Sequence, residues 1–262
     1  AEAIVIGAGA GLSTAAGLTY SGERVETYFF DFASAYGIRD IYSGGFYPFP
    51  DEESRWGYWC RHALLGGADL DVTPLHKTLL NALKDKKIFL LSTNVDNQFV
   101  KAGMDPALVF ATQGSYERIQ CRRACHPRTY DAVELFRRMD RERVNGRIPS
   151  ELVPKCPVCG GPMVMNLRRD DYFVEDEAWH AAEERFSRFL SECVDGKTVL
   201  LELGVGFNTP TIIRFPFERM AAEFPHTTLV RFNRDYPQLT SEGVSRFMSF
   251  TEDLPEIFLS LA

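Results

Sequence analysis

The chain has 262 residues, of which 45% are hydrophobic and 25% charged, an ordinary composition for one large globular domain or one domain with a smaller insert. Its 29 basic and 36 acidic side chains give a net charge of −7. No basic stripe is visible, which argues against a nucleic-acid-binding protein because phosphate neutralisation drives that affinity. No apolar run approaches the roughly 18 residues of a membrane span, and the first residues do not resemble a signal peptide.

Short apolar, β-branched runs recur along the chain, with helix-length segments between them. We predict strands at residues 3–6, 88–92, 108–111, 198–203, 228–232 and 246–250. Such a pattern is typical of a parallel sheet covered on both faces, so the predicted fold class is α/β with a Rossmann-like, doubly wound sheet. Ligands of these sheets bind at the carboxyl ends of the strands, so functional residues are expected just after each run.

The first run leads directly into a glycine-rich turn, Gly7-Ala-Gly-Ala-Gly11, and then into a helical segment. Glycines at this place let the backbone approach a pyrophosphate, whose charge is met by the free amides of the helix. The spacing departs from the G-x-G-x-x-G dinucleotide fingerprint, because Leu12 stands where the third glycine should fall. A tight turn without a ligand is the alternative for this segment.

Residues 28–59 are dense in aromatic side chains and glycine and contain no clear strand. We predict a helical cap or a mobile lid here, with more of the aromatics in a core than in contact with a ligand. Further along, Asn94 and Asp96 follow the predicted strand at 88–92. In extended backbone their side chains point to the same side, which suits a polar ligand at the strand end. A helix N-cap is the alternative, because Asn and Asp are favoured caps.

Six cysteines in 262 residues are too few for a disulfide scaffold. Four of them form two close pairs, Cys121/Cys125 and Cys156/Cys159, and so supply the four thiolates of a closed tetrahedral zinc site. We therefore predict a structural zinc and a reducing, cytoplasmic location. His126 is a further candidate ligand, although the cysteines suffice without it. Free cysteines in a loop are the alternative.

Five segments in order resemble the sirtuins. Gly9-Ala-Gly-Leu-Ser-Thr-Ala-Ala-Gly17 is similar to their N-terminal signature, and Thr93-Asn-Val-Asp96 to their Asn-x-Asp element. Gln113-Gly114 stands at their His-Gly element, the cysteine pairs follow, and Gly204-Val-Gly206 with Asn233 resembles their C-terminal NAD-binding turns. The resemblance covers nearly the whole chain and implies an NAD-consuming enzyme with a small zinc module. The NAD contacts that it implies are Gly9, Ala10, Gly11, Ser13, Asn94, Asp96, Gln113, Gly204, Gly206 and Asn233.

Two departures from the sirtuin deacylases bear on the reaction. Where those enzymes have Pro-Asp-Phe-Arg, this chain reads Thr19-Tyr-Ser-Gly22, and Gln113 replaces their histidine base. With the aromatic segment, these changes resemble the macrodomain-linked microbial class of sirtuins. That resemblance implies ADP-ribosylation of a lipoyl-carrier protein, similar to the H protein of glycine cleavage, which a macrodomain hydrolase reverses.

Gln113 also points away from deacylation on chemical grounds. Acyl migration in a deacylase needs a base, and an amide cannot accept that proton, so the loss should cost about 10²–10⁴-fold in rate. A carboxylate acceptor of ADP-ribose arrives already deprotonated. We therefore predict an ADP-ribosyltransferase with Asn94, Asp96 and Gln113 as catalytic residues. A deacylase with a repurposed site and an inactive NAD sensor are the alternatives.

The predicted domain organisation follows from these assignments. We expect residues 1–27, 73–114 and 194–262 to form the Rossmann-like domain, and residues 28–72 the lid or helical cap. Residues 115–171 should form the zinc-binding module, and residues 172–193 a connecting helix.

Overall fold

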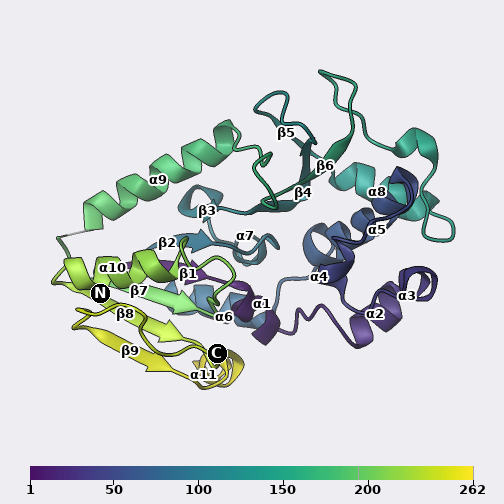
Figure 1. Ribbon diagram of the computed structural model, residues 1–262. Helices are drawn as coiled ribbons and strands as arrows, with labels where there is room; N and C mark the ends of the chain where they lie inside the picture. Colours follow the sequence, from purple (N-terminus) through teal and green to yellow (C-terminus); the bar gives the residue numbers. More distant parts are fainter. Residues whose placement is uncertain (194, 262) are drawn as a thin grey trace. The chain divides into compact units, whose positions relative to one another are not determined.

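The computed structural model describes residues 1–193 and 195–261; residues 194 and 262 of the predicted Rossmann-like domain lie outside this range. The chain divides into two compact units (Figure 1). Unit 1 comprises Ala1–Gly17, Asp71–Gln113 and Glu177–Ala262, and unit 2 comprises Leu18–Leu70 and Gly114–Asp176. Unit 2 thus combines the whole aromatic segment with the cysteine-bearing segment. The four-part division made from the sequence stays a prediction.

Unit 1 is built on a parallel sheet of six strands, which confirms the predicted fold class. Each predicted apolar run becomes one of its strands, with ends that differ by at most two residues. The strands are β1 (Ala3–Ala8), β2 (Lys87–Ser92), β3 (Val109–Ala111), β7 (Thr198–Leu203), β8 (Thr227–Phe232) and β9 (Phe247–Phe250).

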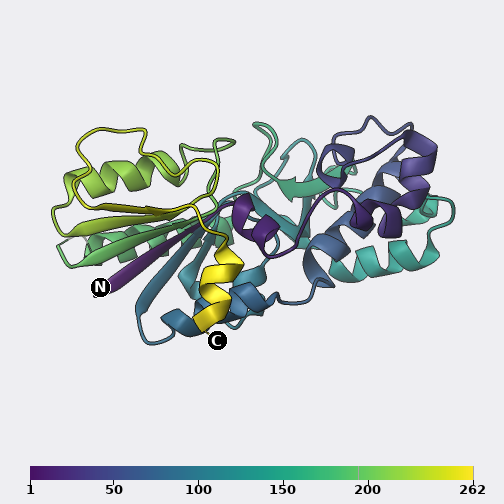
Figure 2. The same cartoon turned by 90° about the horizontal axis from the view of Figure 1, so that it is seen from below.

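Helices cover both faces of this sheet (Figure 2). Along β1 the side chains alternate, so that Ile4 and Ile6 join one apolar cluster while Val5 joins the other. One face carries α1 (Ala10–Ala15), α6 (Pro74–Leu83), α7 (Gln98–Lys101) and α11 (Leu254–Phe258), and the other carries α9 (Glu177–Cys193) and α10 (Arg214–Glu223). Short 3₁₀ helices at Pro106–Leu108 and Leu259–Leu261 complete the unit.

The order of the strands is β3-β2-β1-β7-β8-β9. From β1 the chain builds outward in one direction through β2 and β3, and then returns to the other side of β1 to continue with β7, β8 and β9. The carboxyl ends of β1 and β7 therefore flank the point at which the order reverses. Doubly wound sheets bind their ligands in the crevice at this point.

Unit 2 contains an antiparallel sheet of order β5-β4-β6 and a group of helices. Its strands are β4 (Gly114–Cys121), β5 (Thr129–Asp131) and β6 (Met163–Leu167). Its helices are α2 (Glu23–Tyr28), α3 (Phe30–Tyr36), α4 (Ile41–Gly44), α5 (Glu52–Ala63) with a π-turn at Leu64–Ala68, α8 (Val133–Glu142) and a 3₁₀ turn at Ser150–Leu152.

The aromatic segment is helical, and its largest side chains form much of the core of unit 2. Trp56 and Tyr58 on α5 are fully buried, as is Phe32 on α3. The ring of Trp56 stacks on Phe136 of α8 at 6.1 Å between centroids. The helix α5 is capped by Asp51, whose carboxylate accepts a hydrogen bond from the Ser54 amide at 2.8 Å. The segment is therefore mainly a packed helical layer.

Within the part of the chain that the structure describes, none of the helices combines the length and the apolar character that crossing a lipid bilayer would demand.

Candidate functional site

The glycine turn after β1 packs directly against the turn after β7. The amide of Gly9 donates to Leu203 O at 3.0 Å, and the amide of Gly11 donates to Gly204 O at 2.9 Å. A Cβ on Gly9 would lie 2.7 Å from Gly204 O, and one on Gly11 would lie 2.8 Å from the same atom. These two glycines are therefore required by the contact between the two turns, a reason that the sequence pattern alone did not give.

Ser13 and the two polar residues after β2 form one hydrogen-bonded cluster within unit 1. The Asn94 amide donates from Nδ2 to Gly9 O at 2.9 Å and to Ser13 Oγ at 3.1 Å. Ser13 Oγ in turn donates to Asp96 Oδ2 at 2.6 Å. Asn94 and Asp96 thus reach the same side, as predicted. The cluster fixes the plane of the Asn94 amide and one edge of the Asp96 carboxylate.

The N-cap position of α7 is Asn97 and not Asn94 or Asp96, although Asp96 does contact the start of this helix. Asp96 Oδ1 accepts a hydrogen bond from the Gln98 amide at 3.1 Å, in the first turn of α7. The Gln98 side chain is buried and bonds the Thr73 amide through Oε1 at 2.9 Å. The carboxylate of Asp96 therefore holds the start of α7 through one oxygen and Ser13 through the other.

Gln113 follows β3 and ends a segment of unit 1. The pairing of Ser92 with Ala111 sets the ends of β2 and β3 side by side, and the Thr112 amide donates to Ser92 O at 3.0 Å. Gln113 thus stands two residues beyond the end of β3, as Asn94 does beyond the end of β2. Its Nε2 atom is buried and has no hydrogen-bond partner among the described residues. A buried amide donor without a partner is available to a ligand.

The turns after β7 and β8 are joined by Asn233. Its Nδ2 donates to Val205 O at 2.8 Å, and its Oδ1 accepts from the Tyr236 amide at 2.9 Å. Gly204 has a φ of +61°, which favours glycine, and a Cβ there would lie 2.3 Å from the Leu12 amide nitrogen. Around Gly206, by contrast, an added Cβ would meet no atom within 4 Å. This glycine faces open space.

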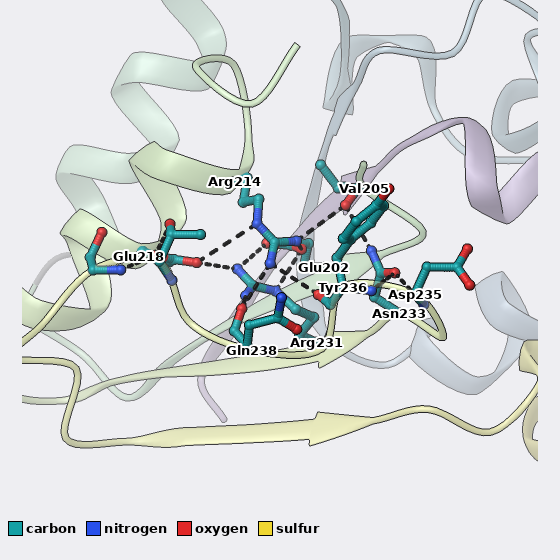
Figure 3. A network of polar contacts seen from close by, with 11 residues as sticks. Glu202, Val205, Arg214, Glu218, Arg231, Asn233, Asp235, Tyr236 and Gln238 are labelled. Carbon is teal, nitrogen blue, oxygen red and sulfur yellow. Dashed lines mark hydrogen bonds and ion pairs between the residues drawn. The ribbon is translucent and has the colours of Figure 1, made fainter. Parts of the chain in front are cut away.

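Behind these turns lies a group of buried charges that the sequence analysis missed (Figure 3). It consists of Glu202 on β7, Arg231 on β8, and Arg214 and Glu218 on α10, all at 0% exposure. The signal was present, because a glutamate and an arginine interrupt the apolar runs Thr198–Leu203 and Thr227–Phe232. Burial raises the pKa of Glu202 and lowers the pKa of Arg214.

The four paired cysteines lie together in unit 2. The Sγ atoms of Cys121 and Cys159 are 3.7 Å apart, those of Cys125 and Cys156 are 3.6 Å apart, and all four lie within 4.8 Å of one another. Four thiolates around a tetrahedral zinc, with Zn–S bonds of about 2.3 Å, would be about 3.8 Å apart. The backbone amide of Cys159 lowers the pKa of the Cys156 thiol to about 6, whereas burial and hydrogen bonds to the other cysteines raise the pKa of the Cys125 thiol, so it is the geometry that supports a metal site. The donor set therefore fits a closed, structural zinc site.

His126 lies beside this cluster but has another partner. Its Nε2 is 2.7 Å from the Tyr130 hydroxyl, and its Nδ1 is 3.9 Å from Cys125 Sγ. The hydrogen bond to Tyr130 orients the ring next to the thiol. The geometry thus assigns the four ligand positions to the cysteines and leaves His126 as a neighbour.

No family model matches the chain. Among curated proteins, it is 34% identical over 255 residues to a Staphylococcus aureus protein named protein ADP-ribosyltransferase, covering 97% of this chain and 81% of the relative. It is 31% identical over 228 residues to a probable bifunctional ADP-ribose hydrolase/ADP-ribosyltransferase of Fusarium oxysporum f. sp. cubense. That match covers 83% of this chain and 38% of the relative, so the chain corresponds to well under half of the fungal protein.

Solved structures of Sir2 proteins share the fold. A Sir2 homolog–NAD complex superposes with a TM-score of 0.56 at 17% identity, covering 99% of this chain and 88% of the other. A mutant Sir2 homologue in complex with ADP-ribose gives a TM-score of 0.60 at 15% identity, covering 99% and 90%. With this fold, and with a match that covers 97% of this chain and 81% of the bacterial relative, the chain belongs to the sirtuin-fold family of protein ADP-ribosyltransferases.

Proposed function

We propose that this enzyme transfers ADP-ribose from NAD to a carboxylate on a carrier protein and releases nicotinamide. The single observation that carries the choice of reaction is Gln113, an amide with a buried, unpartnered nitrogen at the position where a deacylase needs a base. In the transfer, the bond from the ribose anomeric carbon to nicotinamide breaks, and a bond from that carbon to the acceptor oxygen forms.

Asn94 and Asp96 would act on the developing positive charge of the ribose. The two N–H groups of the Asn94 amide are held by Gly9 O and Ser13 Oγ, so the direction of its carbonyl oxygen is set before the substrate binds. Asp96 is anchored at both oxygens and supplies a fixed negative charge. Preorganised dipoles and charges of this kind are worth most in the transition state, because they need no rearrangement there.

Gln113 would orient the ribose or the acceptor by donating from Nε2. This role needs a hydrogen-bond donor and no proton transfer, because the acceptor carboxylate arrives as the anion. The nucleotide would lie along the turns after β1, β7 and β8, at the switch in strand order. The residues proposed to hold it are Gly9, Ala10, Gly11, Ser13, Gly204, Gly206 and Asn233. In unit 2, a zinc bound by the four cysteines would act only on the stability of the module.

The proposed acceptor is a lipoyl-carrier protein of the glycine-cleavage H type, and the proposed functional partner is a macrodomain hydrolase that removes the modification. The fungal relative supports the second part, since its name combines an ADP-ribose hydrolase with an ADP-ribosyltransferase. The choice of carrier depends on the resemblance to the macrodomain-linked sirtuins.

The test is mass spectrometry of the purified protein incubated with isotope-labelled NAD and an H-type carrier, in lipoylated and unlipoylated forms. We expect labelling of the carrier and negligible deacylation of acyl-lysine peptides. Asn94→Ala should reduce labelling by about 10²-fold or more, because it removes an oriented group that acts in the transition state. The matched control is Asn81→Ala, an exposed asparagine on α6, which should label at the wild-type rate.

Gln113→His distinguishes the reactions. This substitution restores the histidine base of the deacylases, which ADP-ribosyl transfer should not need. We expect the variant to label the carrier more slowly than the wild type, because the new side chain would misplace the ribose. Robust wild-type deacylation without carrier labelling would reverse the proposal in favour of a deacylase. NAD binding without turnover on any acceptor would identify a sensor.

A further inference from the structure

The buried charge group of unit 1 contains two arginines with different tasks. Arg231 is held mainly by carboxylates: Nε donates to Glu202 Oε1 at 2.7 Å, and Nη2 donates to Glu202 Oε2 at 3.0 Å and to Glu218 Oε1 at 2.7 Å. Its remaining nitrogen, Nη1, donates to Gln238 O at 2.6 Å. Arg231 and Glu202 thus form a bidentate ion pair, and Glu218 adds a second carboxylate. This geometry offsets the desolvation cost of burying a guanidinium. Arg231 thus ties β8 to β7 and to α10.

Glu218 extends this tie to the segment after β8. Its Oε2 accepts hydrogen bonds from Thr240 N, Thr240 Oγ1 and Ser241 N at 2.7 to 2.9 Å. Burial alone would raise the pKa of Glu218, but these bonds and Arg231 bring the pKa below its ordinary value. The carboxylate is therefore ionised and holds the far end of this segment.

Arg214 is bound mainly by backbone oxygens. Its nearest distances to the two carboxylates are 3.5 Å and 3.9 Å, longer than those of Arg231. Its short hydrogen bonds run from Nη2 to Tyr236 O at 2.9 Å and to Gln238 O at 2.8 Å, and Nη1 reaches Val205 O at 3.3 Å. A buried cation that gives its donors to carbonyls of two turns fixes the shape of those turns.

These contacts close a ring around Asn233. Val205 O accepts from both Arg214 Nη1 and Asn233 Nδ2. Asn233 Oδ1 accepts from the Tyr236 amide, and Tyr236 O accepts from Arg214 Nη2 (Figure 3). The Asn233 side chain is therefore held between two backbone groups that Arg214 also holds.

Two aromatic side chains cover this ring of hydrogen bonds on the solvent side. The Arg214 guanidinium lies 4.5 Å from the centroid of the Phe207 ring, and that ring meets Tyr236 edge-on at 5.0 Å. Phe207 and Tyr236 are 41% and 42% exposed, so the pair lies at the surface beside Gly206 and Asn233. The guanidinium thus supports an aromatic pair as well as the Asn233 side chain.

We propose that Arg214 is a positioning residue for the nucleotide: from beneath the surface it holds Val205, Asn233 and the Phe207–Tyr236 pair in the arrangement that binds NAD. This inference rests on the proposed function, which places NAD at these turns. Arg214 does not touch the nucleotide. Its effect is on affinity, because it preorganises turns that would otherwise have to be ordered when NAD binds.

The test compares Arg214→Lys with Arg219→Lys, an exposed arginine on the same helix. Lysine keeps the buried positive charge, but its donors all lie on one nitrogen and cannot reproduce the planar fork that places Nη1 on Val205 O and Nη2 on the carbonyls of Tyr236 and Gln238. We expect Arg214→Lys to weaken NAD binding in calorimetry about tenfold and to raise KM for NAD equally, while kcat at saturating NAD stays near wild type. Amide hydrogen exchange in residues 205–207 and 234–238 should become faster. Arg219→Lys should change none of these values.

Phe207→Leu provides a second variant that leaves every buried charge in place. It should raise the dissociation constant for NAD in the same direction, with little change in melting temperature, since Phe207 is partly exposed. The positioning role would be overturned if Arg214→Lys lowered the melting temperature but left NAD affinity unchanged, and if Phe207→Leu also left the affinity unchanged. Arg214 would then act only on stability. A wild-type protein that binds no NAD would instead overturn the proposed function itself.

Discussion

Gly9 and Gly206 carry no side chain for different physical reasons. At Gly9 a Cβ would lie 2.7 Å from Gly204 O, whereas at Gly206 it would meet no atom within 4 Å. Gly206→Val should therefore leave the melting temperature nearly unchanged and weaken NAD binding roughly tenfold, because the added side chain fills the space proposed for the nucleotide. Calorimetric titration with NAD measures the affinity, and differential scanning calorimetry measures the stability.

Gly9→Ala gives the comparison. Its Cβ would be forced against backbone, which should cost about 1–3 kcal/mol of unfolding free energy even without nucleotide. Full NAD affinity in Gly206→Val would show that the nucleotide does not pass over this turn.

His62 makes unit 2 sensitive to acid. Its ring stacks on Trp59 at 5.0 Å, its Nε2 is 3.1 Å from the Tyr116 hydroxyl, and its Nδ1 is buried with no partner among the described residues. Burial, with a smaller contribution from Arg24, lowers its pKa from 6.5 to about 3. The folded state therefore keeps the ring neutral while the unfolded state takes up a proton below pH 6.5. Stability from this group is complete above that pH and is lost as the pH falls towards 3.

The loss should reach about 1.4 kcal/mol per pH unit for this one group. Urea unfolding of wild type and His62→Gln at several pH values between about 4 and 7 measures it. The difference between the two slopes should equal that value, because glutamine does not titrate there. His226→Gln, at an exposed histidine, serves as the control and should keep the wild-type slope. Parallel curves for wild type and His62→Gln would contradict the assignment.

At the scale of elements, the four cysteines join the end of β4 to the loop before β6. Cys121 is the last residue of β4, and Cys156 lies 3.6 Å from Cys125 between their sulfurs. We expect one zinc per chain in the purified protein, and its loss in Cys156→Ser with a fall in the melting temperature, because binding of a structural metal is coupled to folding. Elemental analysis and calorimetry provide both measurements.

His126→Gln is the matched variant for this module. It removes the nearby imidazole while all four thiols remain, so the zinc content should stay at one per chain. Zinc loss in His126→Gln with retention in Cys156→Ser would require a different ligand set.

How much the sequence predicts differs between elements. The six parallel strands follow from runs such as Ile88–Ser92, because a strand buried on both faces must be apolar throughout. The same pattern hid the charges at Glu202 and Arg231, because a strand is predicted from its apolar residues. The pattern also does not show that two charges on adjacent strands lie opposite each other. That pairing appears only in the register, which aligns Glu202 with Arg231.

The sequence predicts which residues lie at the candidate site better than it predicts the contacts between them. The rule that ligands bind at strand ends selects Asn94, Gln113 and Asn233, and the structure puts each just beyond a strand of unit 1. The bond from Ser13 to Asp96 and the shared carbonyl of Val205 depend on how separate turns meet. No spacing within one segment contains that information.

At the scale of the whole molecule, the central position of β1 has a consequence for synthesis of the chain. Ala3 pairs with Lys87 on one side and with Thr198 on the other. While roughly the first three quarters of the chain leave the ribosome, one edge of β1 keeps its backbone amides and carbonyls unpaired. Open edges of this kind recruit other strands, so the interval before Thr198 emerges is the period in which the nascent protein most needs a chaperone.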